Sequence, residues 1–175
     1  IQDAHVDNFD RVLPVFRLAD ESASQSAAPQ MDRAVKKAAK VVQKHSMEFN
    51  GKEYNNWIDD AYLLMGKAHF YKQDYLLSKR LFNYVISKYH NHDKVNNAMI
   101  WKARVDVIRG NYEQALNSLD QVRYYDRRGD VSKKASRLYP RVYAQLYIET
   151  GHYDKAIRWL DKAIKENRDK DIVTR

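Results

Sequence analysis

The sequence predicts an all-α fold, a right-handed superhelical solenoid of antiparallel helix hairpins. Three observations support this class. Gly (5) and Pro (3) are rare among the 175 residues, too rare for the many turns of a β-sandwich or barrel. Apolar residues recur at spacings of three and four, which is the period of a helix with one buried face. A turn phrase built on Tyr75 occurs again at Tyr112 and Tyr153, 37 and 41 residues apart, and this indicates a repeat.

The first 50 residues predict a degenerate hairpin. We expect a short helix over Asn8–Phe16, interrupted by Pro14, and then a small, polar loop over Ala19–Gln30. Pro29 would mark the entry to an amphipathic helix over Met31–His45. The face of this helix that we expect to be buried carries Met31, Ala34, Val35, Ala38 and Val42, and the opposite face carries Arg33, Lys36, Lys37, Lys40 and Lys44.

Three further hairpins are predicted at about 57–90, 96–126 and 137–167. Each polar turn ends one helix, and a small residue three positions after its Tyr (Ser78, Ala115, Ala156) lets the two helices approach closely. Inserted residues are expected between hairpins, over Tyr89–Val95 and Asp126–Ser136. We therefore expect residues 1–175 to form a single solenoid domain of about eight helices with a core shared between neighbours, as part of a longer protein.

The hairpins also share a small residue in their first helix: Gly66, Ala103 and Ala144. Together with the Gly-Asp-Tyr type of turn, this pattern resembles the tetratricopeptide repeat (TPR), whose basic unit has 34 residues. The chain departs from that pattern at three positions. Lys102 and Tyr143 stand where a Leu is usual, and Pro140 replaces a Trp or Tyr.

The TPR resemblance implies a binding groove, because in such arrays the first helix of each hairpin lines the concave face. Aromatic, aliphatic and cationic groups mix there, as in a protein or peptide groove. The resemblance does not favour the clamp that some TPR proteins use for a chaperone tail, because Leu63, Trp101, Leu138 and Val142 occupy several clamp positions. The expected groove residues are Asp60, Leu63, Lys67, Phe70, Tyr71, Asn97, Ile100, Arg104, Val107, Ile108, Arg141, Gln145 and Ile148.

Residues able to carry catalysis or bind a metal are sparse. The chain has no Cys and lacks the motifs of nucleophilic hydrolases, phosphate loops and His-Glu-x-x-His sites. His90-Asn91-His92-Asp93 could supply two imidazoles and a carboxylate, but we interpret it as a polar loop between hairpins. Asp59 and Asp60 are expected to stabilise the positive start of a helix. We therefore predict no enzyme activity, no cofactor and no metal.

The net charge of +8 suits nucleic acid, anionic lipid or an acidic protein as a partner, and does not choose among them. The cationic face of the Met31–His45 helix is interpreted as a solvated face. The second cluster is expected to be a mobile charged loop, although Arg with interleaved Tyr also occurs in nucleic-acid grooves. It contains Arg123, Tyr124, Tyr125, Arg127, Arg128, Lys133, Lys134 and Arg137.

Three stretches resemble one family more closely. They are NFDRVLPVF at residues 8–16, MDRAVKKA at 31–38 and NWIDDAYLLMGKAHFY at 56–71. In this order they are similar to the large TPR lipoproteins of the Bacteroidota type IX secretion and gliding-motility machinery (PorW/SprE type). The likeness to this family covers the first half of the chain, and the second half resembles it only as TPR.

This resemblance implies a non-enzymatic periplasmic scaffold that binds other secretion-system subunits, namely the outer-membrane translocon and periplasmic components. It implies no nucleic-acid partner. Contact with the outer membrane would come only from a lipidated Cys upstream of Ile1. If the resemblance does not hold, we expect a cytoplasmic TPR adaptor that binds peptides or, as a further alternative, a basic nucleic-acid-binding protein.

Overall fold

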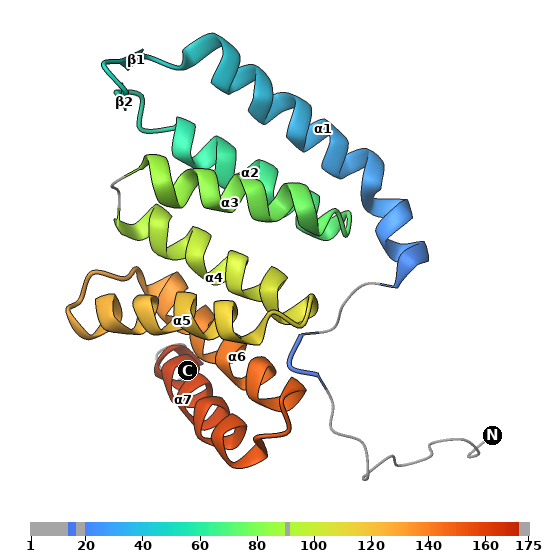
Figure 1. The fold of residues 1–175 in the computed structure, drawn as a ribbon, viewed down its shortest axis with the longest axis vertical. Helices are drawn as coiled ribbons and strands as arrows, with labels where there is room; N and C mark the ends of the chain where they lie inside the picture. Colours follow the sequence, from blue (N-terminus) through green and yellow to red (C-terminus); the bar gives the residue numbers. More distant parts are fainter. Residues whose placement is uncertain (1–13, 17–19, 90–91, 172–175) are drawn as a thin grey trace.

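The computed structural model of the chain describes residues 14–16, 20–89 and 92–171. Consecutive helices of this part pack against one another and form a curved stack (Figure 1). This arrangement confirms the predicted all-α solenoid of helix hairpins. The elements are α1 (Glu21–His45), β1 (Glu48–Phe49), β2 (Lys52–Glu53), α2 (Ile58–Tyr71), α3 (Tyr75–Lys88), α4 (His92–Ile108), α5 (Tyr112–Arg127), α6 (Lys133–Glu149) and α7 (Tyr153–Asp171).

The turns inside the three hairpins have the same geometry, which accounts for the repeated phrase. Gln73, Gly110 and Gly151 each adopt a positive φ of 61°, 73° and 72°, the conformation that ends a helix in the left-handed region. In each turn the N–H of the next residue donates to the carbonyl five residues before it. These bonds of 2.8–2.9 Å run from Asp74 to His69, from Asn111 to Asp106 and from His152 to Tyr147.

Small residues bring the two helices of each hairpin together. Ser78, Ala115 and Ala156 are buried, as predicted from their positions. At Gly66 the two helices leave no room for a side chain, because a Cβ atom there would lie 2.6 Å from Cε1 of the fully buried Phe82 ring. The Ser78 hydroxyl also donates to the Gly66 carbonyl over 2.9 Å. Glycine is therefore required where α2 crosses α3.

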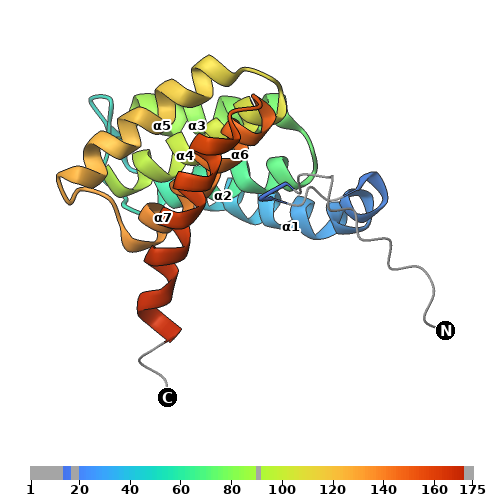
Figure 2. The ribbon, with the colours of Figure 1, turned by 90° about the horizontal axis from the view of Figure 1, so that it is seen from below.

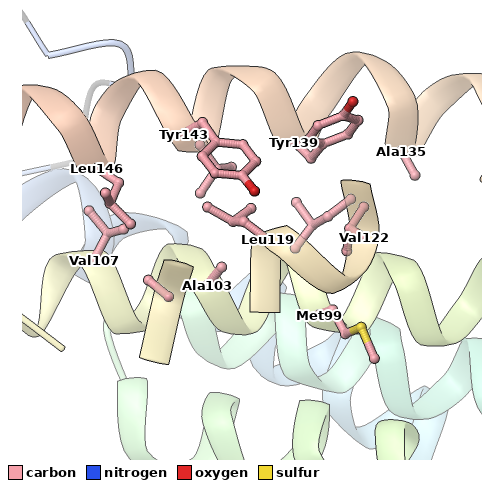
Figure 3. Packing of buried hydrophobic residues seen from close by; sticks show 12 residues of the cluster. Met99, Ala103, Val107, Leu119, Val122, Ala135, Tyr139, Tyr143 and Leu146 are labelled. Carbon is pink, nitrogen blue, oxygen red and sulfur yellow. The ribbon is translucent and has the colours of Figure 1, made fainter. Parts of the chain in front are cut away.

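The largest apolar cluster is shared among α4, α5 and α6, as expected for a solenoid (Figure 3). Two tyrosines of α6 have fully buried side chains, and their hydroxyls reach carboxylates of α5. Tyr143 donates to Asp120 over 2.5 Å, and Tyr139 donates to Asp126 over 2.8 Å. These bonds satisfy the phenol groups at the edge of an otherwise apolar interface.

A buried carboxylate connects the second hairpin to the one before it. Asp106 on α4 is fully buried, and its two oxygens accept from Lys79 of α3 at 2.5 Å and from Lys102 of α4 at 2.9 Å. Lys79 also donates to Gln114 of α5 over 2.9 Å. Because the charge is paired on both oxygens, this residue has a structural role.

The predicted loop over Ala19–Gln30 is wrong, because α1 already begins at Glu21. The Asp20 side chain accepts from the Ala23 N–H over 2.6 Å and caps the helix. The buried Ser24 donates its hydroxyl to the carbonyl of Tyr71 at the end of α2, over 3.0 Å. Small polar residues therefore suit a helix that packs closely on α2, and Pro29 lies inside this helix. The Met31–His45 prediction is confirmed as its C-terminal part.

The predicted helix over Asn8–Phe16 is wrong where it can be compared, since Pro14–Phe16 are not helical. The remainder of that prediction, and with it half of the degenerate hairpin, lies outside the described residues. The insertions are also shorter than expected. α4 begins at His92, inside the expected insertion over Tyr89–Val95. The expected insertion over Asp126–Ser136 is reduced to residues 128–132, which connect α5 to α6.

The sequence analysis missed a small β-hairpin between α1 and α2. Its strands pair Glu48 with Glu53 and Phe49 with Lys52. Asn50 and Gly51 form the turn with φ values of 49° and 77°, as a type I′ turn requires. The Asn-Gly pair was a visible signal for it.

Candidate functional site

The first helices of the three hairpins, α2, α4 and α6, form one side of the solenoid. α4 packs against both α2 and α6, and Figure 2 shows these three helices in a layer separate from α3 and α5. This is the layer to which the TPR resemblance assigned the groove.

The candidate site is a cavity of about 540 Å³ on α4 and α6. Its apolar wall comes from both helices, from the start of α5, and from Pro14 and Phe16. Polar groups are carried by Arg104 on α4, Tyr112 on α5, and Gln145 and Glu149 on α6. The lining residues are Pro14, Phe16, Arg104, Val107, Ile108, Tyr112, Val142, Gln145 and Glu149.

Arg104 lies among aromatic rings. Its guanidinium carbon is 4.3 Å from the ring centroids of both Phe16 and Trp101, and 4.7 Å from that of Phe70. Burial lowers the pKa of the guanidinium, and a hydrogen bond with the Tyr71 hydroxyl partly opposes this. Among the described residues no carboxylate forms an ion pair with Arg104, so its charge is stabilised mainly by the faces of the rings.

Gln145 presents an acceptor to backbone from elsewhere in the chain. Its side chain is 8% exposed, and its Nε2 donates to Glu149 over 2.6 Å, which fixes the orientation of the amide. Its Oε1 accepts from the N–H groups of Val15 at 2.6 Å and of Phe16 at 3.3 Å. The segment Pro14–Phe16 therefore lies in the groove, with the Phe16 ring packed against the core.

A cationic region adjoins the cavity toward α2. Lys67 places its ammonium 5.3 Å from the Trp101 ring centroid. Burial lowers the pKa of Lys67, and the positive charge of Lys134 lowers it further. Asp60 partly compensates, but it is already paired with Lys94. This end of the groove therefore favours a partner with negative charge.

The structure brings four predicted groove residues to the cavity: Arg104, Val107, Ile108 and Gln145. Lys67, Phe70 and Tyr71 adjoin it through Trp101. Leu63, Phe70 and Ile100 are buried in the core, so they support the groove without offering surface to a partner. Asn97 bonds to Asp93 in its own helix, and Arg141 is half-buried on α6.

The sequence analysis missed several lining residues. Tyr112 was recognised only as a turn residue. Val142 was noted only because it occupies a position of the chaperone-tail clamp, and Glu149 was not singled out. Helical spacing could have found Glu149, because it lies one turn after Gln145 on the same face. The occupation of the groove by Pro14–Phe16 carried no local signal.

Neither basic cluster lines the cavity, although Lys134 of the second cluster adds positive charge near Lys67. Arg33 and Lys36 are exposed on α1, as expected of a solvated face. The second cluster was expected to be a mobile loop, and that interpretation is wrong for all of it except Arg128. The others lie in helices: Arg123, Tyr124, Tyr125 and Arg127 in α5, and Lys133, Lys134 and Arg137 in α6. The guanidinium carbon of Arg128 lies 5.6 Å from the centroid of the Tyr124 ring, and the guanidinium donates to the Tyr124 hydroxyl. This arginine therefore already has a partner within the chain.

His90 and Asn91 of the predicted polar loop lie outside the described residues, and His92 begins α4. The described part of the chain contains no group of three or more His, Asp or Glu side chains placed to hold a metal ion. Within the same residues, no helix is both long enough and apolar enough to cross a bilayer.

Comparison with known proteins agrees with the fold. A search of curated proteins found no match to this chain. Residues 142–170, which span the second half of α6 and almost all of α7, match the family model described as tetratricopeptide repeat. The chain thus contains a tetratricopeptide repeat, set in an all-α, TPR-like solenoid.

Proposed function

We propose that this chain is a non-enzymatic adaptor that binds a non-helical segment of a partner protein in the groove on α4 and α6. Repeats of this type support a protein-binding scaffold in general. The observation that carries the proposal is Gln145, a buried and oriented amide whose oxygen accepts from the backbone of a non-helical segment. Backbone recognition of this kind suits a peptide ligand.

We further propose that the partner belongs to the type IX secretion machinery, and that the chain acts in the periplasm as part of an outer-membrane-anchored protein. The support is the resemblance of the stretches at residues 8–16, 31–38 and 56–71 to the secretion and gliding-motility lipoproteins. The partners would be the translocon and periplasmic components.

The test is affinity capture from a solubilised envelope fraction of a bacterium that carries this secretion system. The bait is the chain itself, with Lys67→Gln and Arg104→Gln as groove variants and Lys36→Gln on the exposed face of α1 as the matched control. We expect translocon subunits with the wild type and the control, and reduced recovery with both groove variants. Phe70→Ala is a poor probe, because Phe70 is 4% exposed and its loss would disturb the core.

Two results would refute different parts of this proposal. Recovery of cytosolic proteins alone would exclude the secretion role. Equal recovery with the wild type and both groove variants would exclude the concave face as the binding surface. Circular dichroism of each variant confirms that it is folded before the comparison is made.

A further inference from the structure

The groove already holds a short piece of the same chain. Pro14, Val15 and Phe16 are not helical, and two of their backbone N–H groups donate to Gln145, 129 and 130 residues away in sequence. The Phe16 ring lies against Arg104 and the core cluster. A segment held by its backbone and one aromatic ring has the form of a bound peptide.

We infer that Pro14–Phe16 is an intramolecular ligand that competes with the partner for this groove, and that the partner supplies a bent, non-helical segment carrying an aromatic side chain. This inference rests on the proposed adaptor function and adds its regulation and its ligand chemistry. The partner's aromatic ring takes the place of Phe16 on Arg104, and two consecutive backbone N–H groups take the place of those bonded to Gln145.

Two side chains of the groove recognise different parts of the ligand: Gln145 binds its backbone, and Arg104 binds its aromatic ring. The Oε1 atom of Gln145 accepts from two consecutive backbone N–H groups, which point to the same side only where the backbone bends, so it selects this bent backbone without selecting a sequence. The guanidinium of Arg104 selects for the aromatic ring, because the face of a ring attracts a cation and an aliphatic side chain has no such face. Replacing the ligand Phe by Leu is therefore expected to weaken binding by about 2- to 30-fold.

The strength of the competition follows from tethering. A segment joined to its site by a short linker has an effective concentration of about millimolar. For a peptide whose intrinsic Kd is about 10–100 μM, this competitor raises the apparent Kd by about 10- to 100-fold. Weakening the chain's own segment should release the groove by the same factor.

The test uses the whole chain and a fluorescein-labelled synthetic peptide with the sequence of residues 8–20, measured by fluorescence anisotropy. We expect weak binding to the wild type. Binding should be about 10- to 100-fold tighter to the Phe16→Ala chain, which loses the ring of the competitor. Val15→Pro in the chain removes the shorter of the two N–H bonds to Gln145 without altering the groove wall, and should also tighten binding. Tyr153→Ala, an exposed aromatic on α7, is the matched control and should leave binding as in the wild type.

Two further measurements locate the site. Gln145→Ala combined with Phe16→Ala should abolish the gain, and a labelled peptide with Ala at the position of Phe16 should not bind. Light scattering should show that the wild type is a monomer. A dimer that dissociates on Phe16→Ala would mean that the segment acts between copies, and would overturn the intramolecular reading.

The inference is also overturned if folded Phe16→Ala and Val15→Pro chains bind the peptide no more tightly than the wild type does. That result leaves the adaptor function standing if the envelope capture still depends on Lys67 and Arg104. If the peptide experiment succeeds and the capture does not, the groove is a regulated peptide site and the secretion partner is wrong.

Discussion

Gly66→Ala tests how closely the first hairpin must pack. The added Cβ atom would lie 2.6, 2.9 and 3.0 Å from Cε1, Cδ1 and Cζ of Phe82. The shortest of these is about 0.9 Å inside the ~3.5 Å lower limit of a favourable carbon–carbon contact. Phe82 is fully buried and its ring centroid is 6.4 Å from that of Trp101, so the ring has no free space into which to turn.

Two opposing contributions determine how much Gly66→Ala changes the free energy of unfolding. Overpacking a well-packed core costs about 1–3 kcal/mol, and contact with three atoms of one confined ring places this site at the upper end. Ala gains about 1 kcal/mol over Gly in helix propensity. We therefore expect Gly66→Ala to lower the free energy of unfolding by about 2 kcal/mol.

Urea denaturation followed by circular dichroism at 222 nm measures this change. Phe82→Leu removes the ring atoms that clash, so the double variant Gly66→Ala/Phe82→Leu should be at least as stable as Phe82→Leu alone. A Gly66→Ala protein as stable as the wild type, or more stable, would refute the packing argument. So would an equal loss in both backgrounds, because the effect would then not come from Phe82.

Three further predictions concern charge, turn geometry and pH. Asp106→Ala leaves two partly exposed lysines without their buried partner and should lower the free energy of unfolding, measured by urea denaturation, by about 3 kcal/mol. A loss under about 1 kcal/mol would show that the ion pairs contribute little to stability. Gln73→Gly relieves a left-handed conformation in a side-chain-bearing residue and should raise the free energy of unfolding by about 0.5–1 kcal/mol; a decrease would mean that the Gln73 side chain outweighs its strain. Burial raises the pKa of Tyr62 to about 12, and burial also raises the pKa of Tyr89 and Tyr143. Because these folded-state pKa values exceed the unfolded value of about 10, the stability they contribute is complete below pH 10 and is lost above it. Absorbance at 295 nm should therefore show part of the tyrosine ionisation displaced above pH 10 and coincident with the loss of helical signal; ionisation of all tyrosines by pH 10 in folded protein would contradict this.

The parts of the fold that the sequence could predict are those with local causes. The turns at Gly110 and Gly151 depend on a residue that tolerates positive φ, and the close helix crossings depend on small side chains such as Ala115. Both are visible within a few residues. Arg104 and Gln145 were assigned to one face by the TPR resemblance, and not by the periodicity of the residues themselves.

The errors arose where distant contacts decide the structure. Residues 19–30 resemble a loop by composition, but the bond from Ser24 to the carbonyl of Tyr71 joins atoms 47 residues apart in sequence and fixes this stretch as a helix against α2. The binding of Val15 by Gln145 is longer in range still. The Asn50–Gly51 turn is different, because its signal was local and was overlooked.

The pairing of Asp106 has a mechanical consequence. A solenoid pulled along its axis behaves as a coil spring whose compliance is set at the joints between adjacent hairpins. At the joint between α3 and α4, the oxygens of Asp106 hold one ammonium from each helix. Of these two bonds, the one from Lys79 crosses between the helices, and the one from Lys102 lies within α4. The ion pair between Lys79 and the buried Asp106 therefore opposes sliding of α3 past α4 when the solenoid is under load.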